Sequence, residues 1–188
     1  ILGNGVAFDG SNKYITMSPN ASLDLSEGHF TLAAWIKPET MSLGDGNCAD
    51  WYLEGNSMYC LAWQPEGILG WQSGTGDAYA TLQRQVIVDT DWMEHSRLRF
   101  GFGAAGGWSG YYESPVDVIQ DNSWNHVVLT FGDGIVTLYV NGEMRDSNEV
   151  VFEDKTPAAL QSFQIGRSDN RGLLNFTGVD IWKHDDSG

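Results

Sequence analysis

Residues 124–143, WNHVVLTFGDGIVTLYVNGE, restrict the fold of this chain more than any other segment. Two runs rich in β-branched and aromatic residues, 127–131 and 135–140, are joined by Gly-Asp-Gly, and Asn-Gly follows the second run. Such side chains favour a pleated sheet, and Asp-Gly and Asn-Gly adopt the positive φ angles of tight hairpin turns. The segment therefore predicts an antiparallel hairpin.

The second run of this hairpin is apolar or amphipathic on both faces. Val136, Leu138 and Val140 share one face, and Ile135 and Tyr139 lie on the other. Because a strand with one wetted face alternates apolar and polar residues, this pattern predicts a strand in the interior of a two-layer structure.

Length and composition suit one folded domain over residues 1–188. Apolar residues make up 41% of the chain, and 23 glycines against five prolines indicate many turns. No apolar run is long enough to cross a bilayer, so we expect no membrane insertion. The chain starts at Ile1 without a signal peptide, and we expect it to be a piece of a larger protein with neighbouring domains.

The formal net charge is −15, from 25 acidic and 10 basic residues. A surface of this charge repels phosphate backbones, so we expect no nucleic-acid partner. The acidity serves solubility, and it also offers carboxylates to calcium.

Two cysteines, Cys48 and Cys60, flank a segment that reads as a hairpin turning near Gly55. The two are not directly opposite, so the disulfide that we expect between them requires a bulge or a diagonal pairing. Their spacing does not suit zinc. Two Asn-x-Ser/Thr sequons, at Asn20 and Asn175, are compatible with an extracellular or cell-surface location.

Three segments in order resemble laminin-G-like jelly-roll domains of the concanavalin A-like superfamily. They are GVAFDGSNKYITM with SLDL and HFTLAAWIKPE at the start, the hairpin in the middle, and FQIGRSDNRGLLNFTGVDIW near the end. The resemblance implies an all-β, two-sheet antiparallel jelly-roll sandwich whose first and last strands are neighbours. It also implies a strand over 30–37, ended by Pro38, and structural positions for Trp35, Trp124 and His126.

The segment 41–120 follows this family poorly and is expanded. It predicts further strands, at 49–53, 58–64, 68–72, 85–89, 97–102 and 116–119, and helical periodicity is absent except for a turn or two at 156–162. Gly101–106 matches the GxGxxG pattern of dinucleotide-binding sites, but no helix can follow it, so we interpret it as a glycine-rich loop.

A catalytic alternative rests on Asp89, Asp91 and Glu94. These residues resemble the Glu-x-Asp-x-x-Glu strand of laminarinase-like β-glucan hydrolases. The resemblance makes Asp89 the nucleophile, Asp91 its orienting partner and Glu94 the acid/base. Aspartate in the first position is one methylene shorter than glutamate, which disfavours this chemistry. The other interpretation is a solvated acidic loop.

Calcium is the expected cofactor, because hard oxygen ligands are abundant. By resemblance to laminin-G-like domains, the ligands are Asp9 and Asp180. A second candidate is the loop with alternating oxygen donors at Asp45, Asn47 and Asp50.

Aromatic residues point to a sugar ligand. Several of the eight tryptophans fall in the expanded segment, and GGWSGYYES reads as one aromatic loop. Because sugar rings stack on aromatic planes while carboxylates bind their hydroxyls, we predict a glycan site at Trp92, Trp108, Tyr111, Tyr112 and Glu113. The alternative is that these aromatics pack in the core, which we favour for Trp63 and Trp71.

The sequence therefore predicts a non-catalytic, calcium-assisted carbohydrate-binding module of an extracellular adhesin, surface protein or polysaccharide-degrading enzyme. Its partner would be a glycan or glycoconjugate. Two other functions stay open: a structural or protein–protein adhesion domain without a glycan ligand, and the β-glucan hydrolase.

Overall fold

The structure is a computed structural model. It describes residues 5–8, 14–18, 20, 23, 25, 29–39, 51–54, 57–60, 62–63, 66–73, 78–88, 93–104, 107–150, 160–166 and 180–181. Within this part of the chain the regular elements are β-strands, and none of it forms a helix with the length and hydropathy of a membrane span.

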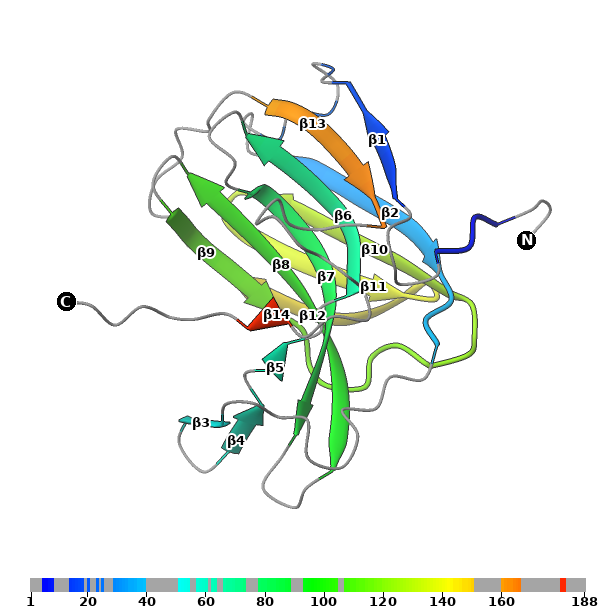
Figure 1. The fold of residues 1–188 in the computed structure, drawn as a ribbon, viewed down its shortest axis with the longest axis vertical. Coiled ribbons are helices and arrows are strands. Elements are labelled where there is room, and N and C mark those ends of the chain that lie inside the picture. Colours follow the sequence, from blue (N-terminus) through cyan, green and yellow to red (C-terminus); the bar gives the residue numbers. More distant parts are fainter. Residues whose placement is uncertain are drawn as a thin grey trace.

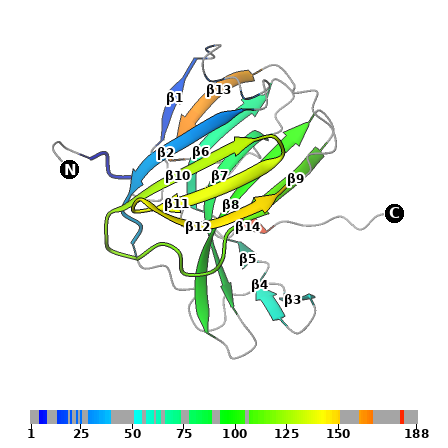
Figure 2. The ribbon, with the colours of Figure 1, turned by 180° about the vertical axis from the view of Figure 1, so that it is seen from behind.

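Two antiparallel sheets stacked face to face form the body of the molecule (Figure 1). The larger sheet has the strand order β1-β13-β6-β7-β8-β9, with bounds β1 Ile15–Met17, β6 Glu66–Ser73, β7 Ala78–Val88, β8 Glu94–Ala104, β9 Gly107–Glu113 and β13 Leu160–Ile165. The smaller sheet, which faces the viewer in Figure 2, has the order β12-β11-β10-β2, with bounds β2 Phe30–Ile36, β10 Asn125–Gly132, β11 Ile135–Val140 and β12 Glu143–Glu149. This arrangement confirms the predicted all-β sandwich of two antiparallel sheets.

Two short strand pairs accompany the sandwich: β3 Trp51–Glu54 with β4 Ser57–Cys60, and β5 Ala62–Trp63 with β14 Asp180–Ile181. The sequence predicts that the first and last strands are neighbours, and this detail is wrong. The neighbour of β1 is β13, while β14 pairs with β5.

The predicted hairpin is confirmed as β10 and β11, which pair from Val127 with Val140 to Gly132 with Ile135. Its turn has positive φ at Asp133 (52°) and Gly134 (80°). Positive φ at both central residues is the backbone of a type I′ turn, whose twist matches that of the flanking strands. β11 lies between β10 and β12, and one of its faces, with Val136, Leu138 and Val140, is buried as expected, whereas Ile135 on its other face is 46% exposed.

The hydrophobic core lies between the two sheets. Alternate residues of β10 and β11 point inward, so that Leu129 and Leu138 are fully buried. The Phe30 ring of the smaller sheet contacts the Phe100 ring of the larger one, with centroids 5.5 Å apart. Trp71 is only 2% exposed, which confirms its predicted place in the core. Burial of each such side chain contributes about 1.5–3 kcal/mol, so this layer stabilises the sandwich.

Two local predictions are wrong. Residues 116–119 form no strand, because Asp117 adopts a φ of 57° and its side chain bonds to β8. The predicted helical turn at 156–162 is contradicted at Leu160, which begins β13 and pairs with Ser73 of β6. In both places tertiary hydrogen bonds override the local sequence preference.

Candidate functional site

The segment predicted to form an aromatic loop is a strand. Gly107–Glu113 forms β9, the edge strand of the larger sheet, and it pairs with the glycine-rich end of β8. The same pairing shows that Gly101 and Gly103 lie in β8, so the GxGxxG segment is not simply a loop. Because side chains alternate along a strand, the consecutive aromatics of β9 point to opposite faces of the sheet.

Tyr112 points into the core. It is 2% exposed, and its hydroxyl donates a hydrogen bond of 2.9 Å to the Asp146 carboxylate on β12. Burial, together with this hydrogen bond, raises the pKa of Tyr112. β9 and β12 are edge strands of different sheets, so the bond closes one side of the sandwich. Tyr112 is therefore a structural residue and not part of the predicted ligand surface.

Tyr111 points outward and is 52% exposed. The Arg99 guanidinium lies over its ring, 4.1 Å from the centroid. Such a cation–π contact holds the ring and the guanidinium in a fixed geometry.

Glu113 lies beside this pair on the same outer face. Its carboxylate is 2.6 Å from Arg97 Nη2 and 3.7 Å from Arg99 Nε. Burial lowers the pKa of Arg99, while the charge of Glu113 and then that of Tyr111 oppose this effect. The side chains of Arg97, Arg99 and Glu113 are all half-buried. The ion pairs between them hold planar hydrogen-bonding groups on the outer surface of the sheet. We call Arg97, Arg99, Tyr111 and Glu113 the Tyr111 face.

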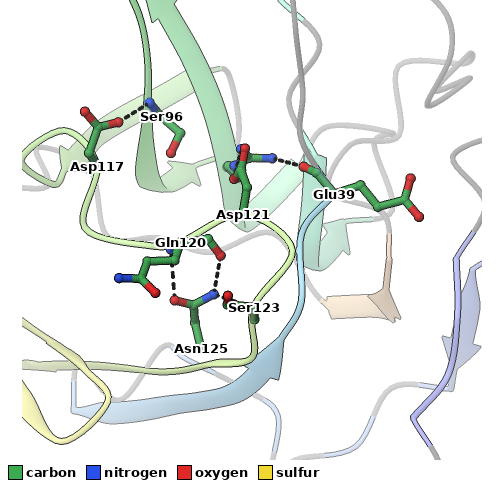
Figure 3. A network of polar contacts seen from close by, with 8 residues as sticks. Glu39, Ser96, Asp117, Gln120, Asp121, Ser123 and Asn125 are labelled. Carbon is green, nitrogen blue, oxygen red and sulfur yellow. Dashed lines mark hydrogen bonds and ion pairs between the residues drawn. The ribbon is translucent and has the colours of Figure 1, made fainter.

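The end of this face is tied to the segment after β9. The Asp117 carboxylate accepts hydrogen bonds from the backbone N–H of Ser96 (3.0 Å) and lies 2.6 Å from His95 Nδ1 (Figure 3 shows the Ser96 bond). Burial works against ionisation, but the contacts with His95 and Ser96 outweigh it and lower the pKa of Asp117.

Two buried polar side chains hold the rest of that segment (Figure 3). Arg84, which is 2% exposed, donates to the Glu39 carbonyl (3.1 Å) and to the Asp121 carboxylate. Asn125, which is 1% exposed, donates to the carbonyls of Gln120 and Ser123, both at 2.8 Å. Buried polar groups are costly unless they are bonded, so these contacts fix one conformation for residues 117–125.

The structure describes one of the three residues on which the hydrolase alternative rests, Glu94. β7 ends at Val88, β8 begins at Glu94, and these two residues pair across the hairpin. These bounds place only Glu94, so the hydrolase alternative stays a prediction. Asp89 and Asp91 themselves lie outside the described residues.

Other predicted residues are not tested. Trp108 lies in β9, but its side chain is outside the described set, and so is Trp92. Of the predicted calcium ligands, Asp180 begins β14 opposite Trp63, and the others lie outside the described residues, namely Asp9, Asp45, Asn47 and Asp50. No group of three or more His, Cys, Asp or Glu suited to a metal occurs in the described part of the chain.

The disulfide also stays a prediction. Cys60 ends β4 and pairs with Trp51 of β3, while Cys48 lies outside the described residues. This register agrees with the expectation that the two cysteines are not directly opposite.

Sequence reasoning missed Arg97 and Arg99. Their signal is the alternation Arg-Leu-Arg-Phe, which places two of only ten basic residues on the outer face of one strand. Arg84 and Asn125 gave no comparable signal, because nothing in the sequence distinguishes a buried arginine or asparagine from the more usual exposed one.

The comparison with family models agrees with this fold. The family model described as the concanavalin A-like lectin/glucanases superfamily matches residues 9–181. No curated protein matches the sequence. Among solved structures, the galectin LEC-6 of Caenorhabditis elegans aligns with 12% identity over 87% of this chain and 92% of the galectin, with a TM-score of 0.43.

Proposed function

Because the chain belongs to the concanavalin A-like lectin/glucanases superfamily, we propose that it is a non-catalytic carbohydrate-binding module whose ligand lies on the Tyr111 face. The observation that carries the proposal is the exposed Tyr111 ring, which stands beside the ion-paired Arg99 and Glu113.

These groups match the chemistry of a sugar ring. The apolar C–H face of a pyranose stacks on an aromatic plane, and its hydroxyls bind planar donors and acceptors. Arg97 and Arg99 supply donors, and Glu113 supplies acceptor oxygens. Because the ion pairs already hold these side chains, binding loses little further side-chain entropy.

The setting of the module is part of the proposal. We place it in an extracellular or cell-surface protein, next to other domains, with calcium bound at Asp9 and Asp180 to support the fold. The acidic composition, with 25 carboxylates, supports a role for calcium.

The experiment is a glycan microarray followed by isothermal titration calorimetry with the strongest ligand. We expect Tyr111→Ala to weaken binding by about ten- to a hundredfold, the usual cost of truncating an aromatic anchor. Val116→Ala, which shortens an exposed apolar side chain outside the Tyr111 face, serves as the control. An array without any bound glycan, or equal affinities for Tyr111→Ala and the wild type, would refute the proposal.

A further inference from the structure

The outer face of the smaller sheet, on the opposite side of the sandwich from the Tyr111 face, carries a second ordered surface (Figure 2). One row of this surface consists of hydroxyl residues and crosses all four strands. Thr130 of β10 pairs with Thr31 of β2 and with Thr137 of β11, and Thr137 pairs with Ser147 of β12. The Thr137 and Ser147 hydroxyls are hydrogen-bonded at 3.1 Å.

Apolar and aromatic side chains lie on one side of this hydroxyl row. The next row is Ala33, Val128, Tyr139 and Met144, which are also cross-strand partners. Beyond it, Trp35 pairs with His126, and their rings stack with centroids 4.8 Å apart at an angle of 24°. We call these three rows the threonine face.

Large apolar groups on this face are open to solvent. Trp35 is 53% exposed and Met144 is 63% exposed; Trp124, which lies outside the three rows and directly before β10, is 43% exposed. The sequence predicts structural positions for Trp35 and Trp124, yet neither ring is buried in the core. Exposed apolar groups that gather on one face of a soluble domain mark an interaction site.

The three rows of the threonine face differ in charge from the rest of the chain. None of the ten residues in the three rows is acidic, although the chain has 25 acidic residues and a net charge of −15. A second copy of the chain would bring the same large negative charge, and the repulsion opposes face-to-face pairing. An uncharged ligand with many hydroxyls meets no such repulsion.

We propose that the threonine face binds an uncharged polysaccharide strand, with Trp35 stacking on a sugar ring and the hydroxyl row bonding along the strand. The strands that carry the row are about 4.8 Å apart, a distance comparable to the length of one pyranose unit. A surface that runs across four strands suits an extended chain better than a single sugar. This site uses none of the residues of the Tyr111 face, so it does not depend on the function proposed for that face.

The test is retention of the protein on microcrystalline cellulose and on chitin, both uncharged, measured as the fraction bound at increasing amounts of polysaccharide. We expect Trp35→Ala to weaken retention at least tenfold. We expect Thr137→Val, which removes one hydroxyl at nearly constant volume, to weaken it by about three- to tenfold, the equivalent of one hydrogen bond. Val116→Ala, which shortens an exposed apolar side chain outside both faces, is the matched control and keeps full retention, and thermal unfolding checks that each variant is folded.

Three results would overturn the inference. They are no retention of the wild type on either polysaccharide, unchanged retention of Trp35→Ala and Thr137→Val, and a wild-type dimer in sedimentation velocity that Trp35→Ala dissociates. The last result would make a second copy of the chain the occupant. If the proposal for the Tyr111 face fails instead, the microarray and the Tyr111→Ala titration give unexpected results, while retention on cellulose and chitin stays as expected.

Discussion

Tyr112→Phe removes one hydroxyl and leaves the ring, so it isolates the hydrogen bond that joins the edges of the two sheets. The lost bond is the 2.9 Å contact with Asp146. Asp146 keeps two donors, the Asn148 side chain at 2.7 Å and the Ser147 backbone N–H at 3.0 Å. Because the carboxylate stays partly bonded, we expect a loss of about 1.5–2 kcal/mol, the lower end for bonds to charged groups.

The assay is thermal and urea unfolding of the wild type, Tyr112→Phe, Asp146→Ala and the double variant. For a domain of this size the expected loss corresponds to a decrease in Tm of about 3–8 °C. The double-mutant cycle should give a coupling energy of about 1–2 kcal/mol between the two side chains. A coupling energy near zero would show that the hydrogen bond between Tyr112 and Asp146 does not stabilise the contact between β9 and β12.

The pH dependence adds an independent check. Burial and the bond to Asp146 raise the pKa of Tyr112 in the folded protein above its unfolded value of about 10. The stability from the neutral phenol is therefore fully present below about pH 10 and declines as the pH rises toward the folded pKa. The stability difference between wild type and Tyr112→Phe should shrink above about pH 10, in equilibrium unfolding measured from pH 7 to 11.

Three further predictions concern other parts of the chain. Gly142→Ala, at a φ of 83° with open space around it, should lower the free energy of unfolding in urea by about 1–2 kcal/mol. Gly166→Ala should lower it by about 1–3 kcal/mol more, because the added Cβ would lie 2.6 Å from the Phe8 ring. Equal losses for the two variants would contradict the contact with Phe8. Asp117→Asn should lower the free energy of unfolding near neutral pH and reduce the loss of stability that acid causes below about pH 4, because a carboxylate with a lowered pKa stabilises the fold only while it is ionised. If urea titrations show the same pH dependence of stability for the variant and the wild type, the Asp117 carboxylate does not stabilise the fold. Chelation of calcium should lower the Tm in differential scanning calorimetry, and added calcium should restore it. An identical Tm in both conditions would show that calcium does not stabilise the fold.

The sequence was most informative where local and tertiary preferences agree. The hairpin of β10 and β11 combines strand-forming residues with two turns that need positive φ, at Asp133-Gly134 and Asn141-Gly142, and both turns have it. The strand predicted at 30–37 is β2, which ends at Ile36, just before Lys37-Pro38. Apolar alternation likewise placed the strand containing Trp71 in the core.

The sequence was misleading for strands that form because they pair with a neighbouring strand, although their residues have little intrinsic preference for strand structure. Glycines in β9 and polar residues throughout β12 obscure the alternation that signals a strand. Both are edge strands held by one neighbour, and charged residues at such edges prevent further pairing. As a result the candidate site was predicted as one aromatic loop, whereas the strand divides Tyr111 and Tyr112 between two faces.

The most direct test of the central claim, that the larger sheet presents a glycan-binding face, is an NMR titration of the isotope-labelled protein with the strongest array ligand. We predict that the largest shift changes fall on backbone amides of β8 and β9 around Arg99, Tyr111 and Glu113, and that Tyr111→Ala abolishes them at the same ligand concentration. Shift changes confined to residues away from these two strands, or unaffected by Tyr111→Ala, would contradict the claim.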